Sequence, residues 1–220
     1  MLDYTFDAGF RKIGTERICG VDEAGRGPLA GPVVAAACIL APDTVIPGLD
    51  DSKKLTEKKR EALYPIITEQ ALYWGIGEAS PAEIDEYNIL NASLLAMRRA
   101  IEAMGVVPDH LLIDGNQTRG FTLPCTAVVH GDAISQSIAA ASVLAKVTRD
   151  RMCEDMEKEY PAYGFAGHKG YPTKAHKLAV YRFGPAPCHR RSFLGFLGKD
   201  REKLEKWLAE ERAKEQDSRS

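Results

Sequence analysis

The order of apolar and polar residues along the chain predicts strands that alternate with helices. Apolar runs ended by glycine or polar turns predict strands over Arg17 to Val21, Val33 to Leu40, Tyr73 to Ala79, His110 to Asp114 and Thr126 to His130. Helical spacing predicts helices over Thr56 to Gln70, Asn88 to Met104, Ala133 to about Glu159 and Thr173 to Phe183. Ser80, Pro81 and Glu83 form a capping box, which predicts a short helix before Asn88. This order indicates an α/β protein with a central mixed β-sheet flanked by helices.

Residues 1–198 are predicted to form one domain, because no internal repeat or low-complexity linker divides them. From Lys199 to Ser220, acidic and basic side chains alternate without a wide apolar stripe. We expect residues 199–220 to form a charged, partly solvated C-terminal helical extension that docks through its few apolar residues, Leu204, Trp207 and Leu208.

Composition excludes the disordered and fibrous classes of protein. The 220 residues are 45% hydrophobic, which is typical of a chain with a real core. The 29 Lys and Arg residues nearly balance the 31 Asp and Glu residues, so the net charge of −2 gives no overall attraction to nucleic acid or to anionic membranes.

Cysteine usage and hydropathy indicate where the protein works. The five cysteines contain no C-x-x-C pair, which favours a reducing, cytoplasmic location. The longest apolar stretch, Pro32 to Pro42, is far shorter than the ~20 residues that a membrane span needs. We therefore expect a soluble protein of the cytoplasm with no membrane partner. A monomer is expected, although no feature of the sequence determines the oligomeric state.

Four carboxylates stand where the strands of such a sheet end. Asp22 and Glu23 follow the first predicted strand, Asp114 ends the fourth, and Asp132 follows the fifth. Ligands bind at this edge of α/β sheets, and clustered carboxylates there suit Mg²⁺ or Mn²⁺, which prefer hard oxygen ligands. Each acid alone could also be a turn former, and Asp132 in particular could cap the helix behind it.

A glycine loop, Gly25, Arg26 and Gly27, directly follows the acid pair. Glycine has no side chain, so backbone N–H groups in such a loop can approach a phosphate or a sugar closely. The same loop could also be a tight connection between strands that binds no ligand.

One segment of the chain is basic and rich in aromatic residues, although the net charge of the whole chain is nearly neutral. Residues 160–199 contain no Asp or Glu, but they hold seven Lys or Arg residues, eight aromatic residues and three of the five histidines. The rest of the chain then holds 22 positive and 31 negative side chains, a balance of −9. Basic side chains mixed with stacking rings are typical of a nucleic-acid groove, although such a run can also be a solvated face around core aromatics.

Tyr171 differs from the other aromatic residues of this segment, because it lies in a polar turn between Gly170 and Pro172. An exposed ring in such a turn is harder to explain by core packing. The three histidines match no familiar spacing of metal ligands. We therefore expect His168, His176 and His189 to support the site or to contact phosphate.

Several ordered motifs resemble those of the bacterial ribonuclease HII family, which belongs to the type 2 ribonucleases H. They are DEAGRGPLAGPVVAAA at residues 22–37, DSKKL at 51–55, YNILNA at 87–92, LIDG at 112–115, GD at 131–132, AAASVLAKVTRDR at 139–151 and HKGY at 168–171. The resemblance runs in order from about Ile18 to Phe193. It implies a ribonuclease H-like fold, with a catalytic domain over residues 1–198 whose basic C-terminal part binds substrate.

The resemblance also implies an activity: an endonuclease that cuts the RNA strand of RNA–DNA hybrids and incises duplex DNA at single ribonucleotides, as in replication and repair. It implies that Asp22, Glu23, Asp114 and Asp132 are catalytic and bind two divalent ions, Mg²⁺ or Mn²⁺, with no organic cofactor. Gly25, Arg26 and Gly27 would read the ribose 2′-hydroxyl, and Tyr171 would pack on the neighbouring deoxyribose. Lys53 and Lys146 would hold backbone phosphate, and the products would carry 5′-phosphate and 3′-hydroxyl ends.

Two other functions compete with this interpretation. The basic, aromatic segment alone would suit a hybrid-binding module without catalysis, but four acids facing a polyanion would then have no purpose. The Gly25 to Gly31 turn would suit a phosphotransferase of small nucleotides, but it lacks the G-x-x-x-x-G-K-[ST] pattern of a phosphate loop.

Overall fold

The computed structural model describes residues 2, 5–11 and 14–217 of the chain. The chain divides into two compact units, one of residues 1–26 and 32–149 and the other of residues 27–31 and 150–220. The sequence-based division into residues 1–198 and 199–220 stays a prediction, and the last three residues of that tail lie outside the described residues.

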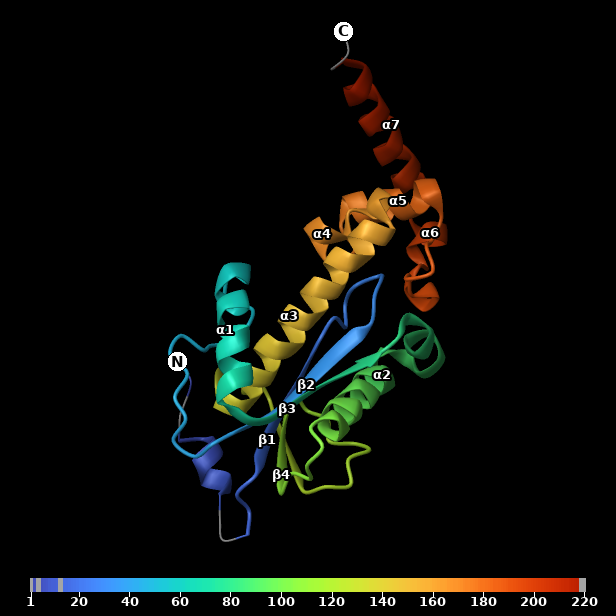
Figure 1. The fold of residues 1–220 in the computed structure, drawn as a ribbon. Coiled ribbons are helices and arrows are strands. Elements are labelled where there is room, and N and C mark those ends of the chain that lie inside the picture. Colours follow the sequence, from blue (N-terminus) through green and yellow to red (C-terminus); the bar gives the residue numbers. More distant parts are fainter. Residues whose placement is uncertain (1, 3–4, 12–13, 218–220) are drawn as a thin grey trace. The chain divides into compact units, whose positions relative to one another are not determined.

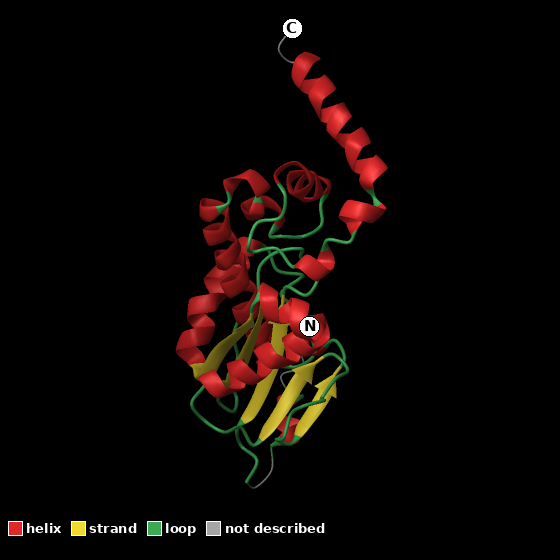
Figure 2. Ribbon diagram, turned by 90° about the vertical axis from the view of Figure 1, so that its right-hand side faces the viewer, coloured by secondary structure: helices red, strands yellow, loops and turns green. Residues whose placement is uncertain are grey.

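The first unit is built on a mixed five-stranded sheet in the order β3-β2-β1-β4-β5 (Figures 1 and 2). The strands are β1 Ile18–Ala24, β2 Val33–Leu40, β3 Ala71–Ala79, β4 His110–Asp114 and β5 Cys125–Val128. β1, β2 and β3 pair antiparallel, whereas β1, β4 and β5 pair parallel. The carboxyl ends of the three parallel strands therefore meet at one edge of the sheet, and the predicted fold class is confirmed.

Helices cover both faces of this sheet (Figure 1). Helix α1 (Glu57–Gln70) and the first part of α3 (Gln136–Glu159) share one core with β2, in which alanines of α3 allow close packing. Helix α2 (Pro81–Ala103) covers the other face, where a Cβ at Gly75 or Gly77 of β3 would overlap the α2 backbone. Two short 3-10 helices, η1 (Asp7–Phe10) and η2 (Gly131–Ala133), complete the unit.

The predicted elements are present, with changes at their ends. The β2 and β4 bounds match the prediction, and the Ser80 capping box opens α2. Asn88 has φ 65° inside α2, so this helix is two helical segments joined at a kink, as predicted. The last strand ends at Val128 rather than His130, because His130 has φ 56° and η2 follows it. For the same reason α3 begins at Gln136 rather than Ala133.

The second unit is helical. It contains η3 Pro161–Tyr163, α4 Phe165–His168, α5 Lys174–Phe183, η4 Arg191–Phe193, α6 Phe196–Lys199 and α7 Arg201–Asp217, together with the end of α3. Residues 27–31 belong to this unit because Leu29 N–H donates to the Gly170 carbonyl and Arg190 N–H donates to the Leu29 carbonyl, both at 2.8 Å. Leu204 of α7 is fully buried, and Trp207 and Leu208 pack against the same core.

Among the described helices, none combines the length and the low charge that a bilayer crossing requires. The expected cytoplasmic location and monomeric state stay predictions.

Candidate active site

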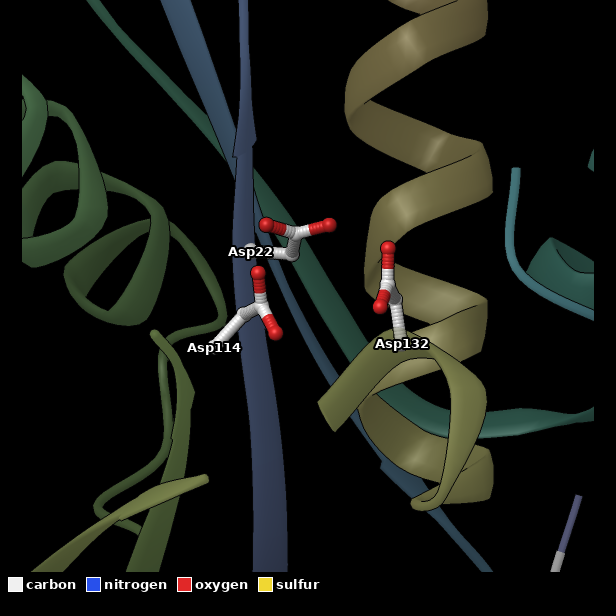
Figure 3. A group of neighbouring side chains, drawn as sticks. All are labelled: Asp22, Asp114 and Asp132. Atoms are coloured by element: carbon white, nitrogen blue, oxygen red, sulfur yellow. The ribbon is translucent and has the colours of Figure 1, made fainter. Parts of the chain in front are cut away.

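Three of the four predicted carboxylates form an acid cluster, Asp22, Asp114 and Asp132 (Figure 3). Asp22 lies on β1, Asp114 ends β4, and Asp132 lies in η2 just before α3. Carboxylate oxygens of the three approach within 4.8 Å of one another. Asp22 and Asp132 are buried and Asp114 is half-buried. The acid cluster therefore stands at the edge where the parallel strands end.

Hydrogen bonds hold the acid cluster in place. Glu23 N–H donates to Asp22 Oδ1 at 2.7 Å, and Ser142 of α3 also bonds to Asp22. Gly131 N–H donates to Asp114 Oδ1 at 2.8 Å. Because Gly131 directly precedes Asp132, this bond fixes the turn that carries Asp132 against the end of β4.

Burial and like charge oppose ionisation of the acid cluster. Burial raises the pKa of Asp22 well above its ordinary value, and the charges of Glu23 and Asp114 raise it further. Burial also raises the pKa of Asp114, and the charge of Asp132 adds to this effect. A bound cation would remove this cost, since it favours the ionised carboxylates. The donor set, three closely spaced carboxylates, fits Mg²⁺ or Mn²⁺.

Lys53 contacts the acid cluster directly. Its Nζ lies 2.8 Å from Asp132 Oδ2, while 76% of its side chain is exposed. Burial of the amine opposes its charge, but the hydrogen bond and charge of Asp132 outweigh this effect and raise the pKa of Lys53. The family resemblance implies a phosphate contact for Lys53, whereas the DSKKL motif carries no signal for this ion pair with Asp132. Lys146, the other predicted phosphate ligand, is half-buried on α3.

Glu23, the fourth predicted carboxylate, lies beside the acid cluster but outside the group of three acids whose oxygens approach one another. Successive side chains of a strand point to opposite faces of the sheet, so Asp22 faces α3 whereas Glu23 faces α2. Glu23 lines a small hollow together with Leu90 of α2 and with Asp114. Arg26 Nη1 lies 3.2 Å from Glu23 Oε1. Burial raises the pKa of Glu23 although Arg26 opposes the shift. A metal-binding role for Glu23 stays a prediction.

One expectation about the acids needs correction, and one alternative is excluded. Asp22 and Glu23 lie inside β1 rather than after it, because pairing with Ala36 and Ala35 of β2 extends the strand to Ala24. Asp132 does not cap α3. Ser135 Oγ accepts from Ile138 N–H at 3.2 Å, and Asp7 Oδ2 accepts from Ser137 N–H at 2.9 Å. Since these two side chains cap the helix, the Asp132 carboxylate is available to the acid cluster.

The glycine loop depends on Gly25. This residue has φ +96°, and a Cβ there would overlap the side chain of Arg149. Arg149 is only 1% exposed, and its Nε donates to the Pro32 carbonyl at 3.3 Å. Gly25 is thus required for a left-handed turn that packs directly on a buried guanidinium. No pattern in the sequence marks Arg149 as part of this loop.

Tyr171 and Gly27 are neighbours within the second unit. The Tyr171 side chain is exposed, as predicted, and its Cε1 would lie 3.4 Å from a Cβ at Gly27. The ring therefore lies beside Gly27, the last residue of the glycine loop. Two of the residues predicted to recognise substrate are thereby brought together.

The three histidines support the turn that carries Tyr171. His168 and His176 stack with ring centroids 4.3 Å apart, and His176 Nε2 lies 3.0 Å from His189 Nε2. His176 Nδ1 lies 3.0 Å from the Tyr171 carbonyl, which can only accept, so Nδ1 carries the proton. Burial lowers the pKa of His176 to about 4, so the ring is neutral and accepts from His189 at Nε2. His176 and His189 are buried, which leaves no exposed ring nitrogen for a phosphate, and their contacts with the Tyr171 turn fit the expectation of a supporting role.

Comparison with solved structures defines the class of protein. The fold is similar to that of ribonuclease H2 from Pyrococcus horikoshii, with a TM-score of 0.69 and 28% identity over 86% of this chain and 99% of that chain. It is also similar to that of Bst-RNase HIII in complex with Mn²⁺, with a TM-score of 0.63 and 17% identity over 89% of this chain and 70% of that chain. The fold and the acid cluster thus define a hydrolase with the ribonuclease H fold.

Sequence comparison identifies the family. The family model for ribonuclease HII matches residues 19–195. A ribonuclease HII of Shewanella amazonensis is 58% identical over 177 residues, which are 80% of this chain and 86% of that protein. The chain belongs to the ribonuclease HII family, and it is an endonuclease with ribonuclease H activity on RNA–DNA hybrids.

Proposed function

We propose that this chain hydrolyses the RNA strand of RNA–DNA hybrids and also incises duplex DNA on the 5′ side of single embedded ribonucleotides. The acid cluster carries this proposal, because its closely spaced carboxylates concentrate negative charge that bound divalent cations would offset. The products carry 5′-phosphate and 3′-hydroxyl ends. DNA duplexes that contain ribonucleotides are therefore substrates, as RNA–DNA hybrids are.

Asp22, Asp114 and Asp132 offer the oxygens that would hold two divalent ions, and Glu23 would add a fourth carboxylate from the neighbouring position of β1. When bound, such ions lower the pKa of an attacking water and neutralise charge on the leaving oxygen, so the chain needs no nucleophile of its own. Gly131 N–H and Ser142 orient the carboxylates of Asp114 and Asp22. Either Mg²⁺ or Mn²⁺ suits this donor set.

Other residues of the chain recognise the substrate. The 2′-hydroxyl is the local feature that distinguishes a ribonucleotide within DNA, and a loop with two glycines can meet it through backbone groups at close range. Gly25, Arg26 and Gly27 form this loop, and the exposed ring of Tyr171 beside Gly27 packs on the adjoining deoxyribose. Lys53 and Lys146 bind backbone phosphate, and the exposed, charged amine of Lys53 suits this role.

The test is cleavage of a DNA duplex with one ribonucleotide, in Mg²⁺ or Mn²⁺ and in a chelator. We expect incision on the 5′ side of the ribonucleotide only with metal, and a loss of roughly 10³-fold or more in Asp22→Asn, the order of several kcal/mol of transition-state stabilisation. Asp43→Asn is the matched control, because Asp43 is exposed and Asn tolerates its φ of 64°.

Undiminished cleavage by Asp22→Asn, or cleavage without metal, would refute the proposal. Binding of the duplex without any cleavage would instead indicate a hybrid-binding module. Cleavage of hybrids but not of the single-ribonucleotide duplex would limit the activity to long RNA tracts.

A further inference from the structure

A groove runs along helix α2 in the first unit, beginning at the acid cluster. It consists of three adjoining hollows between α2 and the connection from β4 to β5. The first, of about 40 Å³, is lined by Glu23, Leu90 and Asp114. The second, of about 550 Å³, shares Leu94 with the first. The third, of about 200 Å³, shares Arg98 and Gly120 with the second.

The second hollow carries an excess of positive charge. Arg98, Arg99 and Arg119 line it, with Glu83 as its acid. Glu83 already accepts from Arg99 at 2.7 and 3.0 Å and from the Ser80 N–H at 2.9 Å. The pKa of Glu83 is lowered to about 2, chiefly by Arg99. Glu83 and Arg99 therefore neutralise each other.

Arg98 and Arg119 are the charges that remain in the second hollow. In the described part of the chain neither guanidinium makes an ion pair, although Glu102 lines the third hollow beside Arg98. Arg98 is half-buried and Arg119 is exposed. Planar guanidinium groups without a carboxylate partner are well suited to a phosphate group, which they bind through paired N–H donors.

The YNILNA motif shapes the rim of the second hollow. Asn88 Oδ1 accepts from Leu90 N–H at 3.0 Å and from Asn91 N–H at 3.2 Å, so it caps the segment of α2 after the kink. Asn91 Nδ2 then donates to the Tyr87 carbonyl at 3.0 Å. Tyr87 and Leu90 are left 43% and 37% exposed at the groove. An exposed ring beside phosphate-binding side chains is typical of a surface that binds a nucleic-acid strand.

We propose that Arg98 and Arg119 bind a backbone phosphate of the substrate outside the cleavage site, along a strand that follows α2. The helix is continuous from Leu90 to Arg98, a rise of roughly 12 Å at ~1.5 Å per residue. A strand advances ~3.4 Å per nucleotide, so the bound phosphate lies roughly three to four nucleotides from the scissile one. This inference rests on the proposed function, because it takes the acid cluster as the point of cleavage.

The test is binding of a fluorescent RNA–DNA hybrid, measured by anisotropy in a chelator so that no cleavage occurs. Single neutral methylphosphonate linkages are placed along each strand in turn. For the wild-type protein we expect a loss of affinity with a neutral linkage about three to four nucleotides from the cleavage position, on one side only. Arg98→Ala/Arg119→Ala should bind the unmodified hybrid roughly tenfold more weakly, the order of losing a charge-assisted hydrogen bond. It should be insensitive to that one linkage.

Controls separate this site from a general effect of charge. Lys58→Ala/Lys59→Ala removes two exposed charges from α1 and should keep the wild-type pattern along the strands. Arg98→Lys/Arg119→Lys keeps the charge and should restore part of the affinity. If the alanine variant fails to fold, by circular dichroism, the lysine variant and the wild-type linkage scan still decide the question.

Equal affinities of the wild-type protein and the folded arginine variant, or a wild-type scan with no sensitive position at that distance, would overturn the proposal. Calorimetry of adenosine monophosphate binding provides a further test. If the arginine-to-alanine variant loses this binding but binds the hybrid as the wild-type protein does, the proposal is overturned, because the occupant would then be a free nucleotide. Failure of the proposed function is distinguishable, because a protein that binds hybrid through the groove but never cleaves it would pass this test and fail the cleavage assay.

Discussion

Asp22→Asn should stabilise the metal-free protein while it abolishes cleavage. Asp22 is 4% exposed, and it lies among like charges that raise its pKa together with burial. An Asn side chain keeps an oxygen that can accept from Glu23 N–H, the bond that Asp22 Oδ1 makes at 2.7 Å. The substitution thus removes the charge of Asp22 but preserves its packing and this hydrogen bond.

The size of the gain follows from the spacing of the acid cluster. Two unit charges 4.8 Å apart repel by roughly 3 kcal/mol at an effective dielectric constant of about 20. Lys53 offsets part of the charge of Asp132, and protonation of Asp22 limits the cost of its own charge. We therefore expect a gain of about 1 to 3 kcal/mol in the free energy of unfolding, or roughly 3 to 10 °C in Tm for a chain of this size.

The sign of the pH dependence follows from the direction of the pKa shift. The folded protein binds the proton of Asp22 more tightly than the unfolded chain does, because the pKa is raised on folding. The destabilising effect is therefore full above the raised pKa, decreases as the pH falls below it, and disappears below the pKa of the unfolded chain. The difference in Tm between Asp22→Asn and the wild-type protein should shrink as the pH is lowered.

Thermal unfolding in a chelator, at several pH values, measures this difference directly, with Asp43→Asn as the control. Added Mg²⁺ or Mn²⁺ should raise the Tm of the wild-type protein more than that of Asp22→Asn, because ligands stabilise the state that binds them. A Tm of Asp22→Asn at or below the wild-type value in the chelator at alkaline pH would refute the reasoning that repulsion within the acid cluster limits stability.

Three further substitutions test the proposed substrate-binding residues. Tyr171→Ala should reduce cleavage at a single ribonucleotide more than it reduces hybrid binding, and equal losses in both assays would indicate that the ring is structural. Lys53→Ala should weaken hybrid binding and make its salt dependence shallower by about one unit, whereas an unchanged slope would exclude a phosphate contact. Gly25→Ala should lower Tm and activity more than Gly48→Ala does. Both glycines have positive φ, but only a Cβ at position 25 meets a neighbouring side chain. Equal effects of the two substitutions would contradict the packing of Arg149 on the loop.

Local patterns in the sequence predict most of the elements. Alternation and helical spacing locate β2, β4 and the capped start of α2, because these elements depend on short-range periodicity and on Ser80 and Glu83. The extent of β1 could not be predicted in the same way. Its last residues are held by pairing with Ala35 and Ala36 of β2, and pairing partners are not readable from the polarity of Asp22 and Glu23.

Long-range contacts in the site were also beyond prediction from spacing. Asp7 caps α3 at Ser137, 130 residues further along the chain, and Lys53 pairs with Asp132 across 79 residues. Charge alone offers many possible partners for each of these side chains. The three histidines show the same limit, since their buried contacts with backbone groups and with one another follow from the folding of the second unit.

Asp22 and Glu23 face opposite sides of the sheet because β1 extends to Ala24, beyond the predicted end of the strand at Val21. Once β1 continues through both residues, the period of two places Asp22 toward α3, with Ser142, and Glu23 toward α2, with Leu90. Asp114, at the end of β4, contributes to both the acid cluster and the groove. One of its oxygens lies within 4.8 Å of oxygens of Asp22 and Asp132, and the residue also lines the first hollow. The groove along α2 therefore begins at a carboxylate of the acid cluster itself. In the proposed binding mode, a strand held at the acid cluster continues past Asp114 toward Arg98 and Arg119, which make no ion pair within the described part of the chain.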